Sequence, residues 1–306
     1  MQRRDQVLIR DPGARHYRLE LAKPLAAVHW PYAYMSALAY KESFATVIGK
    51  HKLLTKTQPT ESALVQEGRA PPFDAGLTEE GWKPWEVDFA SEEAKQYAAN
   101  HHLRIHAFTR RQASGLEVAV AFGGTDPRNL SDWISNFRWL IPFHDDEYTV
   151  VVKDIVGAIQ AELQRLIKQE GLSADNVTLI STGHSLGGGL AQQFAYAAKR
   201  TAGDLAVSQV FAFDPSPVTG FFSVRKTVRD ASRRGLLIDR PFERHEILSY
   251  LRWLIALIVP PSARDPAIRG IRYNLLSTWN LIASHSIPKL AAALYVTAHE
   301  GIAPAQ

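Results

Sequence analysis

Hydrophobic and polar positions alternate along residues 103–110 (LRIHAFTR), and this period of two predicts a β-strand. A second strand is predicted at residues 116–122 (LEVAVAF), because the polar pair Ser114 and Gly115 between the two runs favours a turn. Apolar residues then recur every three or four positions from Val152 to Ile167, which predicts a helix that ends near Gly171. This helix should cover one face of a sheet.

Apolar runs and helical patterns continue to alternate through the second half of the chain. Residues 177–183 (VTLISTG) predict a buried strand, residues 186–200 a helix, and residues 208–213 (SQVFAF) another buried strand. Residues 236–246 predict a further strand and residues 289–297 a late helix. Such alternation is typical of an α/β fold with a mostly parallel central sheet flanked by helices.

The first hundred residues have a different pattern. Tyr32, Met35 and Leu38 have helical spacing, and polar, proline-containing connections follow around residues 58–72. We therefore expect a helical and loop-rich N-terminal extension at residues 1–100, packed on an α/β domain at residues 101–306. Trp82 and Trp85 are predicted to cover a core, with a ligand surface as the alternative.

Composition narrows the class of protein. Hydrophobic residues make up 46% of the 306 residues and charged residues 22%, as in folded soluble proteins. With no cysteine, the chain has no disulfide, no thiolate metal site and no cysteine nucleophile. The formal charge of +4 is too small to indicate nucleic-acid binding by itself.

The N-terminal residues and the apolar runs of the sequence bear on the cellular location of the protein. No secretory signal pattern follows the N-terminus, and no apolar run approaches the roughly 20 residues of a membrane-spanning helix. We expect a cytoplasmic protein, or one exported by a route that needs no signal peptide.

The chemistry is concentrated in residues 183–187, which read Gly-His-Ser-Leu-Gly, a G-x-S-x-G motif. In this motif the serine occupies a strained turn between a strand and a helix, and the glycines leave room for it. Both flanking elements are predicted independently here. We therefore expect Ser185 to be a nucleophile, with a glycine-rich packing turn as the alternative.

A serine nucleophile needs a base and an acid, which follow it in the chain in the order Ser, Asp or Glu, His in this type of site. The histidines after Ser185 are His245, His285 and His299. We expect His285 to be the base, because it precedes a predicted helix in a loop. His299 is close to the C-terminus, and His245 has an acidic neighbour suited to a different role.

The sequence constrains the choice of the acid and of the oxyanion-hole donors less than the choice of the nucleophile and the base. Glu246 is the expected acid, because it would stand near the end of the predicted strand at residues 236–246; Asp214 and Asp239 are the alternatives. The expected oxyanion donors are the backbone amide of Leu186 and, from the loop after an earlier strand, Thr125. This chemistry requires no metal and no cofactor.

Together these motifs resemble the class 3 lipases, the fungal-lipase-like branch of the α/β hydrolases. The resemblance rests on Phe122-Gly-Gly-Thr125, on residues 132–136 (DWISN), on the long helix after them and on residues 183–188 (GHSLGG). It implies an α/β-hydrolase fold, a nucleophile at Ser185 and an oxyanion-hole role for Thr125. It also implies an acid one strand after residues 210–213, which favours Glu246 over Asp214, and a base at His285.

The predicted function is hydrolysis of carboxylic esters of lipids through an acyl-enzyme on Ser185. A lipid or other ester is the expected substrate, and residues 137–143 (FRWLIPF) and 250–259 (YLRWLIALIV) are candidates for transient contact with a lipid interface. Core packing is the alternative for both segments. The basic residues between 223 and 245 would suit anionic head groups, with a solvated helix face as the alternative.

Three other functions remain open at this stage. The acyl group could pass to an acceptor other than water, which would make the protein an acyltransferase. The protein could be a phospholipase effector toxin delivered without a signal peptide, or a catalytically silent hydrolase fold that acts as a binding module. The sequence does not specify acyl chain length, head group or oligomeric state.

Overall fold

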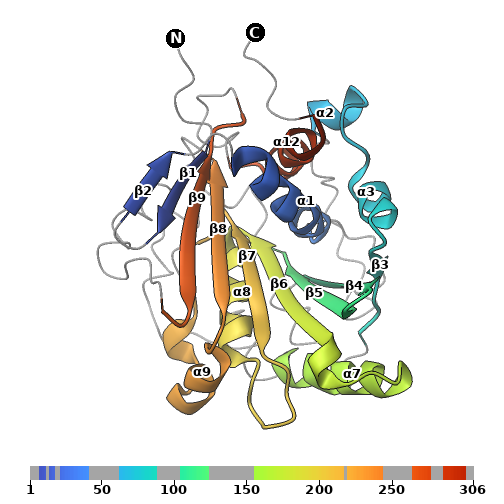
Figure 1. The fold of residues 1–306 in the computed structure, drawn as a ribbon, viewed down its shortest axis with the longest axis vertical. Helices are drawn as coiled ribbons and strands as arrows, with labels where there is room; N and C mark the ends of the chain where they lie inside the picture. Colours follow the sequence, from blue (N-terminus) through green and yellow to red (C-terminus); the bar gives the residue numbers. More distant parts are fainter. Residues whose placement is uncertain are drawn as a thin grey trace.

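The computed structural model describes residues 7–11, 14–17, 21–40, 62–87, 104–123, 155–216, 219–243, 264–276 and 285–300. Within these residues the strands form one sheet in the order β2-β1-β9-β8-β7-β6-β5-β4-β3 (Figure 1). Neighbouring strands from β5 to β9 are parallel, and the strands at both edges pair antiparallel. The strands are β1 (Val7–Asp11), β2 (Ala14–Tyr17), β3 (Lys83–Pro84), β4 (Ile105–Gln112), β5 (Gly115–Phe122), β6 (Val177–His184), β7 (Val207–Phe213), β8 (Leu237–Glu243) and β9 (Ala267–Tyr273).

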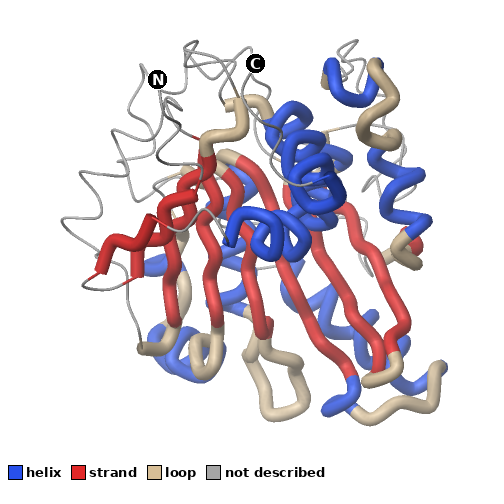
Figure 2. Tube along the Cα trace, turned by 45° about the horizontal axis from the view of Figure 1, so that its top comes forward, coloured by secondary structure: helices blue, strands red, loops and turns tan. Residues whose placement is uncertain are grey.

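Helices cover both faces of the sheet (Figure 2). One face carries α1 (Ala22–Leu38) and α12 (Ile287–Glu300), with the short helices α2 (Ala63–Gln66) and α3 (Phe73–Glu79) beside them. The other face carries α7 (Val156–Gln169), α8 (Leu186–Ala197) and α9 (Lys226–Ser232), with single 3₁₀ turns at Ala174–Asn176 and Phe221–Ser223. None of the helices in the described part of the chain is long and apolar enough to cross a bilayer.

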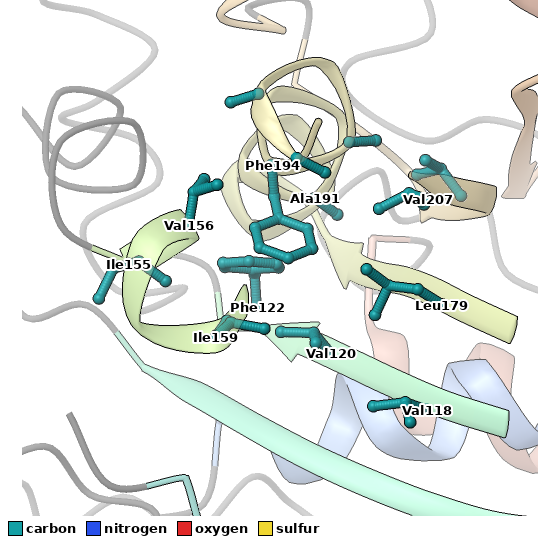
Figure 3. Packing of buried hydrophobic residues seen from close by; sticks show 14 of the residues in the cluster. Val118, Val120, Phe122, Ile155, Val156, Ile159, Leu179, Ala191, Phe194 and Val207 are labelled. Carbon is teal, nitrogen blue, oxygen red and sulfur yellow. The ribbon is translucent and has the colours of Figure 1, made fainter. Parts of the chain in front are cut away.

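Strand β5 shows how the sequence supports two hydrophobic layers. Val118, Val120 and Phe122 point to the α7 and α8 side, while Ala119 and Ala121 belong to the α1 and α12 side. Figure 3 shows the first of these layers, where the ring of Phe122 packs against Phe194 at 5.4 Å between centroids. A strand buried on both faces has a continuous apolar sequence, and this is why β5 and β6 could be recognised.

The α/β prediction is confirmed, and β4 to β8, α7, α8 and α12 lie where the sequence placed them, to within a few residues. The helical and loop-rich reading of the first hundred residues is incomplete, because β1, β2 and β3 also come from that region. The boundary near residue 100 stays a prediction, because it falls between the described ranges that end at 87 and begin again at 104.

Helix α1 joins the N-terminal region to the core. It packs against α12 and against β6, and most of its residues from Ala22 to Leu38 are buried. The predicted core role of the tryptophans is confirmed, because Trp82 and Trp85 are both buried. The N-terminal region is thus part of the same folded unit as the sheet.

Candidate active site

Ser185 occupies the turn between β6 and α8, at the carboxyl end of the parallel strands. Its backbone φ is 57°, a value that a residue with a side chain adopts only under strain. Backbone hydrogen bonds hold the turn: the Ser185 amide donates to the Phe213 carbonyl at 3.0 Å, and the Ser216 amide donates to the Ser185 carbonyl at 2.9 Å. The strand, strained turn and helix predicted for the motif are therefore all present.

The glycines on either side of Ser185 allow this turn to form. A β-carbon on Gly183 would overlap the carbonyl oxygen of Gly187, and one on Gly187 would overlap the carbonyl oxygen of Phe122. Both obstacles are backbone atoms, so no rotamer change could relieve them. The second contact also brings the end of β5 against the start of α8, where the expected oxyanion loop begins after Gly123.

Two histidines and an aspartate meet beside this turn. Donor atoms of His184, Asp214 and His285 all lie within 4.8 Å of one another. The rings of His184 and His285 are 4.6 Å apart between centroids, and His184 Nε2 is 3.9 Å from Asp214 Oδ2. All three residues are buried, and His285 is 6% exposed. The expected base His285 therefore lies in one cluster with a carboxylate and with His184, the residue before Ser185.

Asp214 is held in place by backbone contacts with β8. It follows β7 directly and has a φ of 40°. Its amide donates to the Pro241 carbonyl at 2.9 Å, and its Oδ1 accepts the Glu243 amide at 3.1 Å. The Glu243 carboxylate in turn accepts the Leu275 amide. Asp214 is thus a rigidly oriented, fully buried carboxylate at the ends of the strands.

Asp239, the other alternative acid, is engaged in a separate buried network. Arg269 donates to both of its carboxylate oxygens at 2.7 Å, and His29 Nε2 lies 3.3 Å from Oδ2. Burial alone raises the pKa of Asp239, but the hydrogen bonds from His29 and Arg269 outweigh it and hold the pKa below its ordinary value. This carboxylate joins α1, β8 and β9.

A tyrosine from the end of α1 reaches the histidine pair. The Tyr40 hydroxyl is 2.9 Å from His184 Nδ1 and 3.2 Å from the His184 carbonyl oxygen. Arg104 Nη1 donates to the Tyr40 carbonyl at 3.0 Å and fixes the chain there. No local pattern predicts this contact, since 144 residues separate Tyr40 from His184.

Several expected site residues lie outside the described residues. These are Glu246, the expected acid, Thr125, the expected second oxyanion donor, the alternative base His245, and the lid candidates at 137–143 and 250–259. Of the remaining predicted residues, the structure places Ser185, Leu186, Asp214 and His285 at one edge of the sheet. The structure adds His184 and Tyr40 to this set. His184 could have been suspected from its place next to Ser185 in the motif.

The cluster also contains the donor types of a metal site. Two imidazoles and one carboxylate are a ligand set that zinc accepts. Serine hydrolases use the same residue types for base and acid, however, so the donor set alone does not choose between the two chemistries.

One family model matches part of the chain. Residues 73–205, less than half of the chain, match the family model of the Tle-like phospholipase domain. No curated protein sequence matches the chain.

Solved lipase structures are similar to this one at low sequence identity. A propeptide complex of Rhizomucor miehei lipase is 15% identical over 96% of this chain and 83% of that chain, with a TM-score of 0.42. A deletion mutant of the same complex matches 79% of this chain but only 64% of its own length, at 15% identity and a TM-score of 0.42. A lipase from Rhizopus microsporus var. chinensis is 16% identical over 86% of each chain, with a TM-score of 0.44.

The predicted resemblance to lipases agrees with the match of the central part of the chain to a phospholipase domain. Independently of these comparisons, the structure shows parallel strands from β5 to β9. It also shows a strained turn at Ser185 between β6 and α8. The chain has an α/β fold, and its central part resembles a Tle-like phospholipase domain.

Proposed function

We propose that the protein hydrolyses carboxylic ester bonds of phospholipids through an acyl-enzyme formed on Ser185. The observation that carries the proposal is the strained turn that holds Ser185 beside a buried histidine and carboxylate. The match of residues 73–205 to a phospholipase domain supports a phospholipid as the substrate class. No cofactor takes part in this chemistry.

His285 acts as the base in this proposal. It takes the proton of Ser185 as the hydroxyl oxygen attacks the ester carbonyl, and it returns the proton to the departing alcohol. Water then attacks the acyl-enzyme with help from the same imidazole, which releases the fatty acid and restores Ser185.

Asp214 orients His285 and stabilises its charged form. The location of its carboxylate within 4.8 Å of a ring nitrogen of His285 and its backbone hydrogen bonds support this role. Glu246, favoured by the family resemblance, is the alternative acid, and variants of the two residues distinguish them.

The negative charge on the substrate oxygen needs donors that are already in place. The Leu186 amide meets this need, because it is the first residue of α8 and lies at the positive end of the helix dipole. Thr125 is the proposed second donor, from the loop that begins after β5.

Hydrolysis of mixed phosphatidylethanolamine and phosphatidylglycerol vesicles tests the activity. Release of fatty acid by the wild-type protein, and a fall of at least about a thousandfold in Ser185→Ala, is the expected result. A folded Ser185→Ala protein that retains the wild-type rate would contradict the proposal.

Metal-dependent hydrolysis is the second candidate, because His184, Asp214 and His285 are also suitable ligands. Dialysis against EDTA followed by assay in metal-free buffer separates the two chemistries. The serine mechanism predicts an unchanged rate, whereas loss of activity that added Zn²⁺ restores would favour the metal.

A further inference from the structure

The proton of the Tyr40 hydroxyl determines which nitrogen of His184 carries hydrogen. The hydroxyl donates to the His184 carbonyl oxygen at 3.2 Å, and its oxygen lies 2.9 Å from His184 Nδ1. A phenol has a single proton, so in the second contact the ring N–H donates to the Tyr40 oxygen. The neutral imidazole of His184 therefore has its proton on Nδ1 and its lone pair on Nε2.

The lone pair on His184 Nε2 faces a carboxylate. Nε2 lies 3.9 Å from Asp214 Oδ2, and both side chains are buried. Two electron-pair donors that face each other away from water repel, and a cation between them removes the repulsion. The separation is too long for an N–H···O hydrogen bond. It is instead close to twice the roughly 2.1 Å that separates a zinc ion from a nitrogen or oxygen ligand.

His285 supplies a third donor to the same cluster. One of its ring nitrogens lies within 4.8 Å of the donor atoms of His184 and Asp214. Tetrahedral zinc holds its ligand atoms about 3.4 Å apart, so His285 has to approach by at most about 1.4 Å, a movement on the scale of a side-chain rotation. Two imidazoles and one carboxylate suit zinc better than Mg²⁺ or Ca²⁺, which prefer oxygen ligands.

The surroundings of the cluster orient two of the three donors. A metal-binding histidine usually donates its second N–H to a fixed partner, and the Tyr40 oxygen is that partner for His184. Arg104 in turn donates to the Tyr40 carbonyl at 3.0 Å. Asp214 Oδ1 accepts the Glu243 amide at 3.1 Å, while Oδ2 faces His184. Both donors are thus held in position before an ion binds.

A second buried pair of histidine and aspartate shows the contrast. His29 Nε2 is 3.3 Å from Asp239 Oδ2, which is a hydrogen-bond distance, and Arg269 donates to both oxygens of Asp239. The charge of that carboxylate is therefore balanced by protons at short range. The longer distance of 3.9 Å between His184 and Asp214 matches a metal ion instead.

We propose that His184, Asp214 and His285 bind a Zn²⁺ ion that reversibly inhibits the serine chemistry. A neutral imidazole has one lone pair, so once His285 binds zinc its other nitrogen carries the proton and cannot accept the proton of Ser185. The ion also neutralises the charge of Asp214. No bond within the protein forms or breaks, so a chelator restores the active state. This inference rests on the proposed function and names a regulator of the same site.

The test uses wild-type protein that has been freed of metal with EDTA and then freed of EDTA by dialysis. Zn²⁺ is added at neutral pH, equilibrium dialysis measures the bound zinc, and a fluorophosphonate ester measures the reactivity of Ser185. We expect one zinc ion to bind per chain and to slow labelling by at least about a hundredfold, the contribution of a general base. EDTA should restore the rate, and Mg²⁺ or Ca²⁺ at the same concentration should leave it unchanged.

Two histidine variants show whether the cluster is the site. His184→Gln removes a ligand, so zinc should bind and inhibit at least about tenfold more weakly. His299→Gln is the control, because His299 is an exposed histidine of α12 outside the cluster. For each variant the labelling rate with zinc is divided by the rate without zinc, so an effect on the basal rate cancels. Equal zinc dependence of the two variants would overturn the proposal.

Tyr40→Phe is a second variant that keeps all three ligands. It removes the oxygen that accepts the His184 Nδ1–H, so zinc should bind about tenfold more weakly. This variant decides the question if His184→Gln does not fold. A Tyr40→Phe protein with the zinc affinity of the wild type would refute the proposal.

Separate measurements of binding and labelling distinguish this inference from the proposed function. Wild-type protein that is not labelled at Ser185 in the absence of zinc contradicts the serine mechanism. Labelled wild type that binds no zinc, or that binds zinc and keeps its labelling rate, contradicts the inhibitory site alone. Faster ester hydrolysis on addition of zinc would also contradict inhibition, and would favour the metal-dependent reaction.

Discussion

Two buried aspartates show how the surroundings of a residue decide its role. Asp214 and Asp239 are both fully buried at neighbouring strands. Asp239 is bonded by Arg269 and His29 and so serves the packing of α1 on the sheet. Asp214 accepts a backbone amide on one oxygen, while its other oxygen faces the histidine pair. The contacts of Asp239 are therefore those of a structural residue, whereas Asp214 has an oxygen that faces the histidines, as its proposed role requires.

Substitution of the acids tests this division. We expect Asp214→Asn to slow fluorophosphonate labelling of Ser185 by at least about a hundredfold, because His285 loses the charge that orients it. Asp239→Asn should leave labelling of the folded protein near the wild-type rate but lower its stability by about 3 kcal/mol, since Arg269 and His29 lose their buried partner. The readouts are labelling kinetics and urea unfolding.

Glu246→Gln completes the comparison of acids. The proposal predicts a labelling rate close to wild type for this variant. A hundredfold loss in Glu246→Gln together with a near-normal Asp214→Asn would transfer the orienting role to Glu246, as the family resemblance implies.

At the residue level, the sequence predicted those site residues that belong to a local sequence motif. Ser185 is recognisable because its glycines and its flanking elements form a contiguous signature. Chain order left three histidines, and His285 was predicted among them because it precedes a helix. The choice between acids depends on which carboxylate meets His285 in space, and Tyr40 depends on a contact between distant segments. Neither fact is present in any local pattern.

The junction of β6 and α8 is the element on which the site depends. It forces Ser185 to a φ of 57° and seats Gly183 and Gly187 against backbone carbonyls. Side-chain adjustment cannot relieve such contacts. The position of Ser185, the proposed nucleophile, therefore depends on the absence of a β-carbon at Gly183 and at Gly187.

Gly183→Ala is expected to displace this junction. The added methyl group overlaps the Gly187 carbonyl oxygen, so the variant should lose about 1–3 kcal/mol of stability and label about a hundredfold more slowly. Gly203→Ala is the control, because its β-carbon would meet only Thr201 Oγ1 at 4.0 Å. Equal labelling rates for the two variants would show that the junction tolerates the extra atom.

At the element level, doubly buried strands were predicted well and edge strands poorly. β5 and β6 are mostly apolar runs, as expected for strands that are buried on both faces of a sheet. β9 (AIRGIRY) mixes arginine and glycine with its apolar residues, and β1 and β2 are short antiparallel strands at the edge. Such strands are defined by their partners in the sheet.

In the whole molecule, the N-terminal and C-terminal regions of the described chain pack together on one sheet. β1 pairs with β9, and α1 packs on α12, so the N-terminal region and the C-terminal helix stabilise each other. Buried ionisable groups make this unit sensitive to pH. Burial, reinforced by the charge of Arg104, lowers the pKa of His106 from 6.5 to about 4.

Stability should therefore fall on acidification. The unfolded chain binds a proton at His106 below pH 6.5, whereas the folded chain does so only near pH 4, so the contribution is complete above pH 6.5 and is lost as the pH falls through 4. It amounts to about 3 kcal/mol. The free energy of unfolding of His106→Gln, measured by urea titration from pH 7 to pH 4, should fall less steeply than that of the wild type. Parallel curves would contradict the assignment.

The central claim is that Ser185 is an activated nucleophile. Treatment of the wild-type protein with a fluorophosphonate ester, followed by mass spectrometry of its peptides, tests this most directly. The account predicts a single phosphonylated site at Ser185, absent from Ser185→Ala and strongly reduced in His285→Ala. Labelling of another residue, or of Ser185 at an equal rate without His285, would contradict it.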